Sequence, residues 1–123
     1  LGPGGLSDIE WTIQLLQLRH ANAYPELRTP STLQALGAAV SAGLVEPSDA
    51  EALADAWRHA SRVRNAVMLV RGRASDALPT EPRDLAAINT LLGIEKPASE
   101  LIEITRRHAR LAAAVVARLF WGE

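Results

Sequence analysis

The residues most able to do chemistry stand together at the start of the chain, where a glycine pair is followed at once by carboxylates. Gly4 and Gly5 can adopt backbone angles closed to other residues, which lets a ligand or another backbone come close. Asp8 and Glu10 follow them. Ser7 and Glu10 have the S-x-x-E spacing of a capping box, so a helix is predicted to begin at Ser7.

The negative charge of this segment indicates which ligands it could bind. A glycine loop that enters a helix can receive phosphate on its free N–H groups. Asp8 and Glu10 in the first turn disfavour bare phosphate and better suit a metal-bound nucleotide or an arginine of another domain. The structural interpretation is a plain helix entry, because negative charge in the first turn suits the helix dipole. Both interpretations can hold together.

The three histidines, His20, His59 and His108, stand far apart in the sequence. There is no H-E-x-x-H motif and no pair of histidines four residues apart, so a zinc site is not indicated. His108 falls on an apolar stripe and is predicted to be a hydrogen-bonded core histidine.

Arginines crowd residues 58–73, and such a run usually forms a solvated face. Arg64 is the exception, because it falls on the apolar stripe predicted for its helix. A buried arginine needs a partner, since an unpaired buried charge is very costly. The partner is either a carboxylate of this chain, such as Asp8 or Glu10, or a nucleotide or another domain. The candidates for buried or interdomain pairing are Arg64, Asn65, Arg73 and Asp76.

Composition bounds the class of protein. The 123 residues suffice for one domain with a core, and the absence of cysteine excludes disulfides and thiolate metal sites. A net charge of −1 gives no general affinity for polyanions, so nucleic acid is not an expected partner. No apolar run approaches the roughly 20 residues that span a bilayer, and no signal peptide precedes the first helix. We expect a cytoplasmic protein without a membrane partner.

Because the chain opens on Leu1, we also expect it to be part of a longer protein.

Helical periodicity predicts an all-α fold, an antiparallel bundle of about five helices. Glycines that follow apolar stripes predict helix ends. The first helix carries two stripes, one through Ile9 and one through Trp11 and Leu18, so it is predicted to lie between two neighbours; Trp11 and Trp57 are predicted to be core residues. The predicted helices cover residues 7–21, 30–42, 48–71, 82–92 and 97–120. Thr29 is the predicted N-cap of the second helix, Ser48 and Glu51 form a predicted capping box at the start of the third, and Leu111 lies on the apolar face of the last.

Several of these segments resemble one family. The strings Gly-Gly-Leu-Ser-Asp-Ile-Glu-Trp at 4–11 and Gln-Leu-Leu-Gln-Leu-Arg-His at 14–20 are similar to the bifunctional glutamine synthetase adenylyltransferase/adenylyl-removing enzymes. Leu-Arg-Thr-Pro at 27–30, the stretch 62–70 and Leu-Phe-Trp-Gly at 119–122 look similar too, so the resemblance runs over nearly the whole chain.

The resemblance implies a place for the chain in a longer enzyme. In that family, such a glycine segment links a nucleotidyltransferase domain to the helical domain behind it. Residues 1–6 would then be the linker and 7–123 the helical bundle. The ending resembles the carboxyl terminus of the second, adenylylating half. Gly4, Gly5, Asp8 and Glu10 would lie at the junction with the active site.

The resemblance also implies chemistry and partners. The full enzyme would transfer AMP from ATP to a tyrosine of glutamine synthetase with magnesium, and a separate half would remove it. A PII-type signal protein and glutamine would regulate it. This chemistry needs a Gly-Ser loop and an Asp-x-Asp pair that holds two metal ions, and neither motif occurs in this chain. The chain alone is therefore expected to hold no cofactor, to contain no catalytic residue and to transfer no nucleotide.

Two other functions remain open. One is a non-enzymatic interaction module that docks a regulator or a target through its arginine-rich face. The other is the helical domain of a related PII uridylyltransferase. The Leu-Phe-Trp-Gly-Glu ending disfavours the second, because that relative usually carries further regulatory domains after its bundle.

Overall fold

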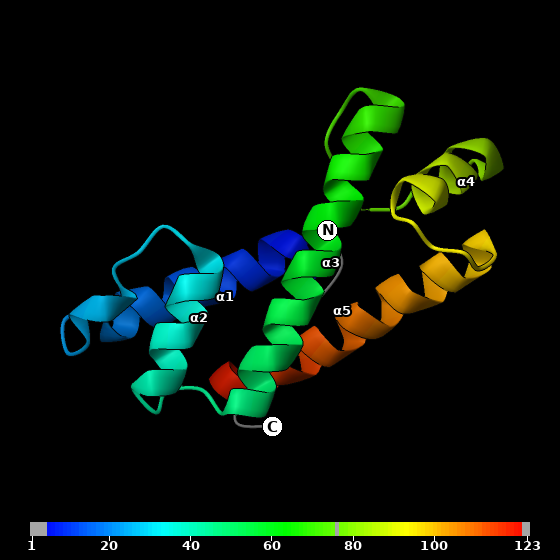
Figure 1. Cartoon of the computed structure of the whole chain (residues 1–123). Coiled ribbons are helices and arrows are strands. Elements are labelled where there is room, and N and C mark those ends of the chain that lie inside the picture. Colours follow the sequence, from blue (N-terminus) through cyan, green and yellow to red (C-terminus); the bar gives the residue numbers. More distant parts are fainter. Residues whose placement is uncertain (1–4, 76, 122–123) are drawn as a thin grey trace.

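The protein is an assembly of helices in which the longest, α3, runs through the middle (Figure 1). The structure, a computed structural model, describes residues 5–75 and 77–121, without the side chain of residue 121. The part of the chain so described contains no strand, which confirms the predicted all-α class. The elements are α1 (Leu6–His20), the short 3-10 helix η1 (Pro25–Leu27), α2 (Thr32–Ser41), α3 (Pro47–Arg71), α4 (Pro82–Leu91) and α5 (Ala98–Trp121).

The predicted helix ends are confirmed, and their cause is local. Gly72 is the C-cap of α3 and adopts φ 74°, a left-handed conformation that a side chain would disfavour. Gly43 and Gly93 have similar φ values just after α2 and α4. Each of these glycines ends a helix where the chain must turn back toward the core.

Three predicted helix starts are wrong, those of α1, α2 and α3. α1 already begins at Leu6, with Gly5 as N-cap and no side-chain cap, so Ser7 lies inside the first turn and the capping box with Glu10 does not form. α3 begins at Pro47 rather than at a second capping box on Ser48. Proline at the first helical position explains this start, because its missing N–H would have no partner there anyway.

Thr29 and Pro30 were predicted to begin α2, which instead begins two residues later. Its N-cap is Ser31, whose Oγ accepts from the backbone N–H of Gln34 at 3.3 Å. Thr29 Oγ1 accepts from the backbone N–H of Ser31 at 3.2 Å. The hydroxyl of Thr29 therefore holds a turn before the helix instead of capping it.

The core consists of two apolar clusters that share α3 and α5. The first joins α1 and α2 to the beginning of α3 and the end of α5, with Ile9 and Leu53 fully buried. The second joins the end of α3 to α4 and the beginning of α5, with Val63 and Ile88 fully buried. Because α3 meets different neighbours along its length, its buried face rotates from one cluster to the other.

Several residues on predicted core faces are exposed. The stripe of α1 through Ile9 is buried as predicted, but Trp11 and Leu18 on the opposite stripe are 60% and 80% exposed. Trp57 packs against the first cluster, in agreement with its prediction. On α5, Ala112 and Val115 are buried while Leu111 faces solvent. Apolar periodicity located each helix but did not show which of two stripes meets a neighbour in this chain.

Within the described residues, none of the helices combines the length and apolar character that crossing a membrane requires. α3 runs upward in Figure 1 and α5 descends across it, and these two helices form the largest helix–helix contact. The fully antiparallel arrangement of the helices stays a prediction.

Candidate functional site

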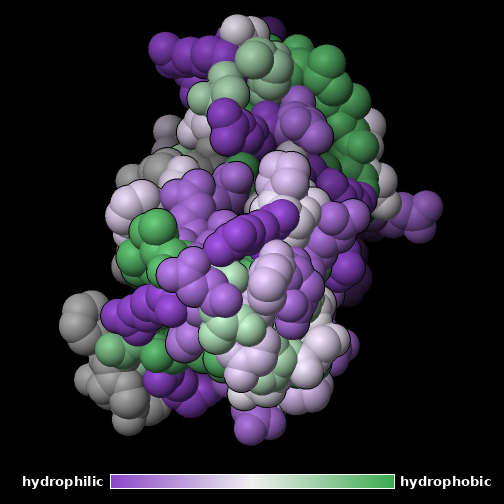
Figure 2. Space-filling view, turned by 90° about the vertical axis from the view of Figure 1, so that its left-hand side faces the viewer, coloured by the Kyte–Doolittle hydropathy of each residue, from purple (hydrophilic) through white to green (hydrophobic). Residues whose placement is uncertain are grey.

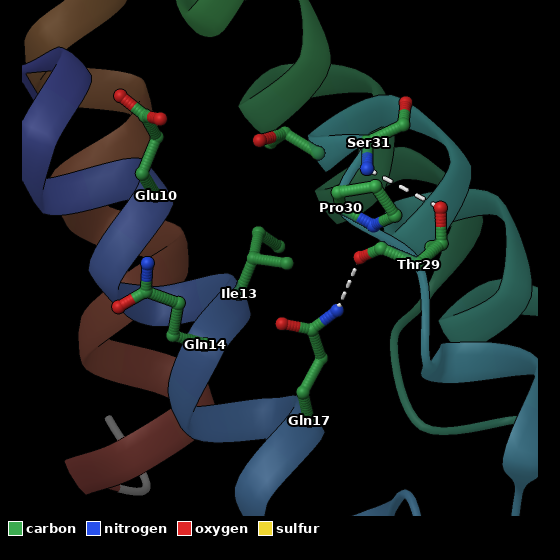
Figure 3. A pocket seen from close by; sticks show the side chains of 8 residues that line it. Glu10, Ile13, Gln14, Gln17, Thr29, Pro30 and Ser31 are labelled. Atoms are coloured by element: carbon green, nitrogen blue, oxygen red, sulfur yellow. Dashed lines mark hydrogen bonds between the residues drawn. The ribbon is translucent and has the colours of Figure 1, made fainter.

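A groove lies between α1 and the beginning of α2, and both of its walls come from segments that carry the sequence resemblance. Its volume is about 270 Å³. Figure 3 shows Glu10 and Gln14 on the side of α1, facing Thr29, Pro30 and Ser31 across the opening. The lining residues are Glu10, Ile13, Gln14, Gln17, Thr29, Pro30, Ser31 and Thr32.

Gln17 builds the groove by tying its two walls together. Its Nε2 donates to the backbone oxygens of Leu27 at 2.7 Å and Thr29 at 2.8 Å. These bonds hold the segment between η1 and α2 against α1. Thr29 Oγ1 also donates to Gln34 Oε1 at 2.9 Å, so the turn before α2 is fixed from both sides. The sequence patterns did not identify Gln17, Ser31 and Thr32 as site residues. Gln17 does lie in the segment 14–20, which resembles the family.

The chemistry of the lining is polar and acceptor-rich. Glu10 is the only charged residue among the lining residues, and it is half-buried. The carboxylate of Glu10 makes no hydrogen bond or ion pair with a described residue. A phosphate would be repelled by this carboxylate, whereas a guanidinium, ammonium or amide donor would be attracted. The groove therefore suits a donor from another chain segment, and of the two predicted ligand classes it favours the arginine.

The structure separates Asp8 from Glu10. Residues two apart on an α-helix differ in direction by about 200°, and Asp8 is not among the groove residues. The backbone oxygen of Asp8 accepts from Thr12 Oγ1 at 2.8 Å. Gly5 has φ −76° and ψ 178°, an extended backbone that any residue adopts, so no glycine-specific angle is used there. Gly4 lies outside the described residues.

The prediction that Arg64 is buried is wrong. Arg64 and Asn65 are exposed on α3, where Val63, Ala66 and Val67 are buried instead. The buried face of α3 has turned toward α4 and α5 at this point, which carries Arg64 to the surface. Arg73 is also exposed, and Asp76 lies outside the described residues. Among described residues, none of these arginines pairs with Asp8 or Glu10, so interdomain pairing stays a prediction.

A second cluster joins α3 to α5 through two histidines. The rings of His59 and His108 stack with centroids 4.7 Å apart and planes 22° from parallel. His59 Nε2 also lies 2.8 Å from Thr105 Oγ1. His108 is half-exposed and makes no hydrogen bond with a described residue, so its prediction as a hydrogen-bonded core histidine is wrong. Because the two histidines lie on different helices, their spacing in the sequence does not indicate that they are in contact.

Both histidines are held toward the neutral form. Burial, followed by the charges of His108 and Arg62, lowers the pKa of His59 from 6.5 to about 4. Burial also lowers the pKa of His108, an effect that Asp55 opposes and Arg107 reinforces. Two stacked neutral rings between helices make a structural contact, and each would resist protonation because the other is close.

The described residues do not fit a magnesium site. No three His, Asp or Glu side chains among residues 5–75 and 77–121 lie close enough together to hold a metal ion. The groove offers a single carboxylate, whereas a two-metal site for phosphoryl transfer needs several. No step involving a metal ion is therefore derived from these side chains.

Comparison with known proteins gives the class. A family model described as GlnD PII-uridylyltransferase matches residues 1–121, and the chain belongs to this family.

Individual relatives agree with the resemblance found in the sequence and confirm it. The bifunctional glutamine synthetase adenylyltransferase/adenylyl-removing enzyme of Cutibacterium acnes is 51% identical over 124 residues, which is 100% of this chain and 13% of that protein. The enzyme of the same name from Streptomyces coelicolor is 54% identical over 99% of this chain and 12% of its own length. That of Mycolicibacterium smegmatis is 47% identical, also over 99% of this chain and 12% of its length. The chain thus spans about an eighth of the length of these relatives.

Proposed function

We propose that this chain is the helical domain of a glutamine synthetase adenylyltransferase, next to the nucleotidyltransferase domain of the adenylylating half. One observation carries the proposal: the groove is walled by two segments, around Glu10 and around Thr29–Pro30, that are far apart in sequence and that each resemble this family. Relatives named as this enzyme match the chain over its whole length, which supports the same assignment.

The role of the domain is to hold the catalytic domain in position. A donor group of that domain enters the groove and meets the carboxylate of Glu10 and the hydroxyls of Ser31 and Thr32. Gly4 and Gly5 join the two domains, and Asp8 lies on the adjoining side of α1. Because a displacement of about 1 Å can cost a large factor in rate, such positioning affects catalysis without contact with the substrate.

The proposed full protein transfers AMP from ATP to a tyrosine of glutamine synthetase in the cytoplasm. ATP and magnesium would be held by residues outside this chain, since the described residues offer no metal site. Glutamine synthetase is the substrate protein, as the names of the relatives suggest. A PII-type signal protein is the proposed regulator.

A second function is favoured by the description of the family model. That description names a PII uridylyltransferase, so the second candidate is that the same helical domain belongs to an enzyme with PII as its substrate and UTP as its nucleotide. The helical fold alone does not separate the two, because function resides in the catalytic domain.

The full-length polypeptide that contains this chain tests the assignment. It is incubated with radiolabelled ATP and glutamine synthetase, and separately with radiolabelled UTP and PII. We expect label on glutamine synthetase from ATP and none on PII from UTP. Label on PII alone would replace the proposal by the uridylyltransferase, and label on neither protein would contradict both.

A further inference from the structure

The second half of α3 carries a marked charge asymmetry. From residue 56 to residue 75 the sequence contains five arginines and no acidic residue. Arg58 and Arg71 pair with Asp55 and Asp84. Arg64 and Arg73 make no ion pair with a described residue. Positive charge thus remains uncompensated at the end of α3 although the net charge of the whole chain is −1.

Apolar side chains are exposed on the same region. Met68, Leu69 and Leu91 are 46%, 75% and 53% exposed, and they are half of the large exposed hydrophobic residues in the described part of the chain. Figure 2 shows hydrophobic surface near the top of the molecule, at the height where α3 ends in Figure 1. The combination of exposed leucine and unpaired arginine is typical of a surface that meets another protein.

A cavity between α3 and α4 gives this surface a shape. Its volume is about 210 Å³, enough for one large side chain. Leu69 and Leu91 form its apolar walls, and Arg62 stands at its edge, where Arg62 donates to the backbone oxygen of Leu92 at 3.2 Å. The lining residues are Arg62, Asn65, Ala66, Leu69, Leu91 and Leu92.

We infer that this α3–α4 surface docks another domain of the same polypeptide, through a segment that inserts an apolar side chain into the cavity and places carboxylates against Arg62, which makes no ion pair with a described residue. Charge complementarity favours an acidic partner, because the cavity lining contains an arginine and no acidic residue. The matched relatives carry about seven eighths of their length outside this region, so another domain is always present at high effective concentration. Interfaces between domains of one chain are also typically mixed polar and apolar, as here.

This inference does not depend on which nucleotide the protein transfers. It concerns a face of α3 and α4, whereas the proposed function rests on the groove between α1 and α2. Loss of transfer activity and loss of docking are therefore separate results.

Cysteine footprinting tests the docking. The chain has no cysteine, so Asn65→Cys places a single thiol of this chain at the cavity. Maleimide labelling of the peptide that contains position 65 is measured by mass spectrometry, both in the 123-residue chain and in the full-length polypeptide. We expect labelling in the full polypeptide to be slower by about tenfold or more, because hot-spot contacts exclude solvent.

Two further changes test the chemistry of the partner. Added to Asn65→Cys, Leu69→Ser and Arg62→Glu should each restore labelling in the full polypeptide to nearly the rate of the isolated chain with the same change. High salt should act like Arg62→Glu, because it screens exposed charge. Arg110→Glu is the matched control: it reverses an exposed arginine on α5 that pairs with Glu103, and it should leave the protection intact.

Four outcomes would overturn the inference. Equal labelling in the isolated chain and the full polypeptide would show that the surface is free. Protection that survives Arg62→Glu and high salt would contradict an acidic partner. Protection of the isolated chain that grows with its own concentration would indicate a second copy. Protection that appears only with phosphatidylserine vesicles would indicate a membrane.

Discussion

At the scale of single residues, the structure gives Glu10 a different role from the one that the sequence predicts. The S-x-x-E spacing predicts that Glu10 caps the first helix, but α1 begins one residue too early for that bond. Glu10 instead lines the groove on its α1 side (Figure 3), and its carboxylate makes no hydrogen bond with a described residue. A half-buried carboxylate with unused acceptors is a better candidate for binding than one committed to a helix cap.

The stacked histidines predict a pH dependence of stability. The pKa of His59 is lowered in the folded state from 6.5 to about 4, so the unfolded state binds the proton more readily. The contribution is fully present above pH 6.5 and is lost as the pH falls from 6.5 toward 4. Chemical denaturation of the 123-residue chain should therefore show the free energy of unfolding decreasing over this range.

His59→Gln separates this effect from other titrations. Glutamine can still bond Thr105 but does not titrate, so the variant should lose less stability than the unchanged chain between pH 6.5 and 4. The same pH profile for His59→Gln and the unchanged chain would contradict this prediction, because it would show that protonation of His59 costs the folded state no stability.

At the scale of the helices, the sequence predicts where helices end better than where they start. Glycine stops were found correctly, since positive φ is a strong constraint and glycine has few other reasons to stand there. The predicted starts of α1, α2 and α3 are misplaced, because more than one nearby residue fits the role of N-cap, whereas Pro82 correctly marks the start of α4. Ser7 and Ser48 fit the pattern, yet the chain caps with Gly5 and Glu46 instead.

Ser31 and Ser7 give a matched test of these starts. Ser31→Ala removes the bond to the N–H of Gln34 and should destabilise the chain by about 1 kcal/mol, as N-cap losses do. Ser7→Ala should change the free energy of unfolding by less than ~0.5 kcal/mol, because Ser7 is exposed and caps nothing. Urea denaturation of both variants measures the difference. A larger loss for Ser7→Ala than for Ser31→Ala would restore the capping box.

At the scale of the whole molecule, the fold class and the order of the helices could be predicted, but their packing could not. Periodicity shows that a helix has apolar faces, whereas α1 has two such faces and only the one through Ile9 meets a neighbour here. The groove escaped prediction for the same reason. Glu10 was found from its own segment, but its meeting with Thr29 and Ser31 depends on how α1 packs beside α2.

The central claim, that this groove positions a catalytic domain, is tested most directly by Glu10→Gln in the full-length polypeptide. The change removes charge at nearly constant shape, so the melting temperature of the 123-residue chain should move by less than about 3 °C. Adenylylation of glutamine synthetase should fall by about tenfold or more, which is ~1.4 kcal/mol of transition-state stabilisation. Glu26→Gln, an exposed glutamate of η1 away from the groove, should retain full activity. Normal adenylylation by Glu10→Gln would contradict the account and leave the groove as a structural feature of the helix junction.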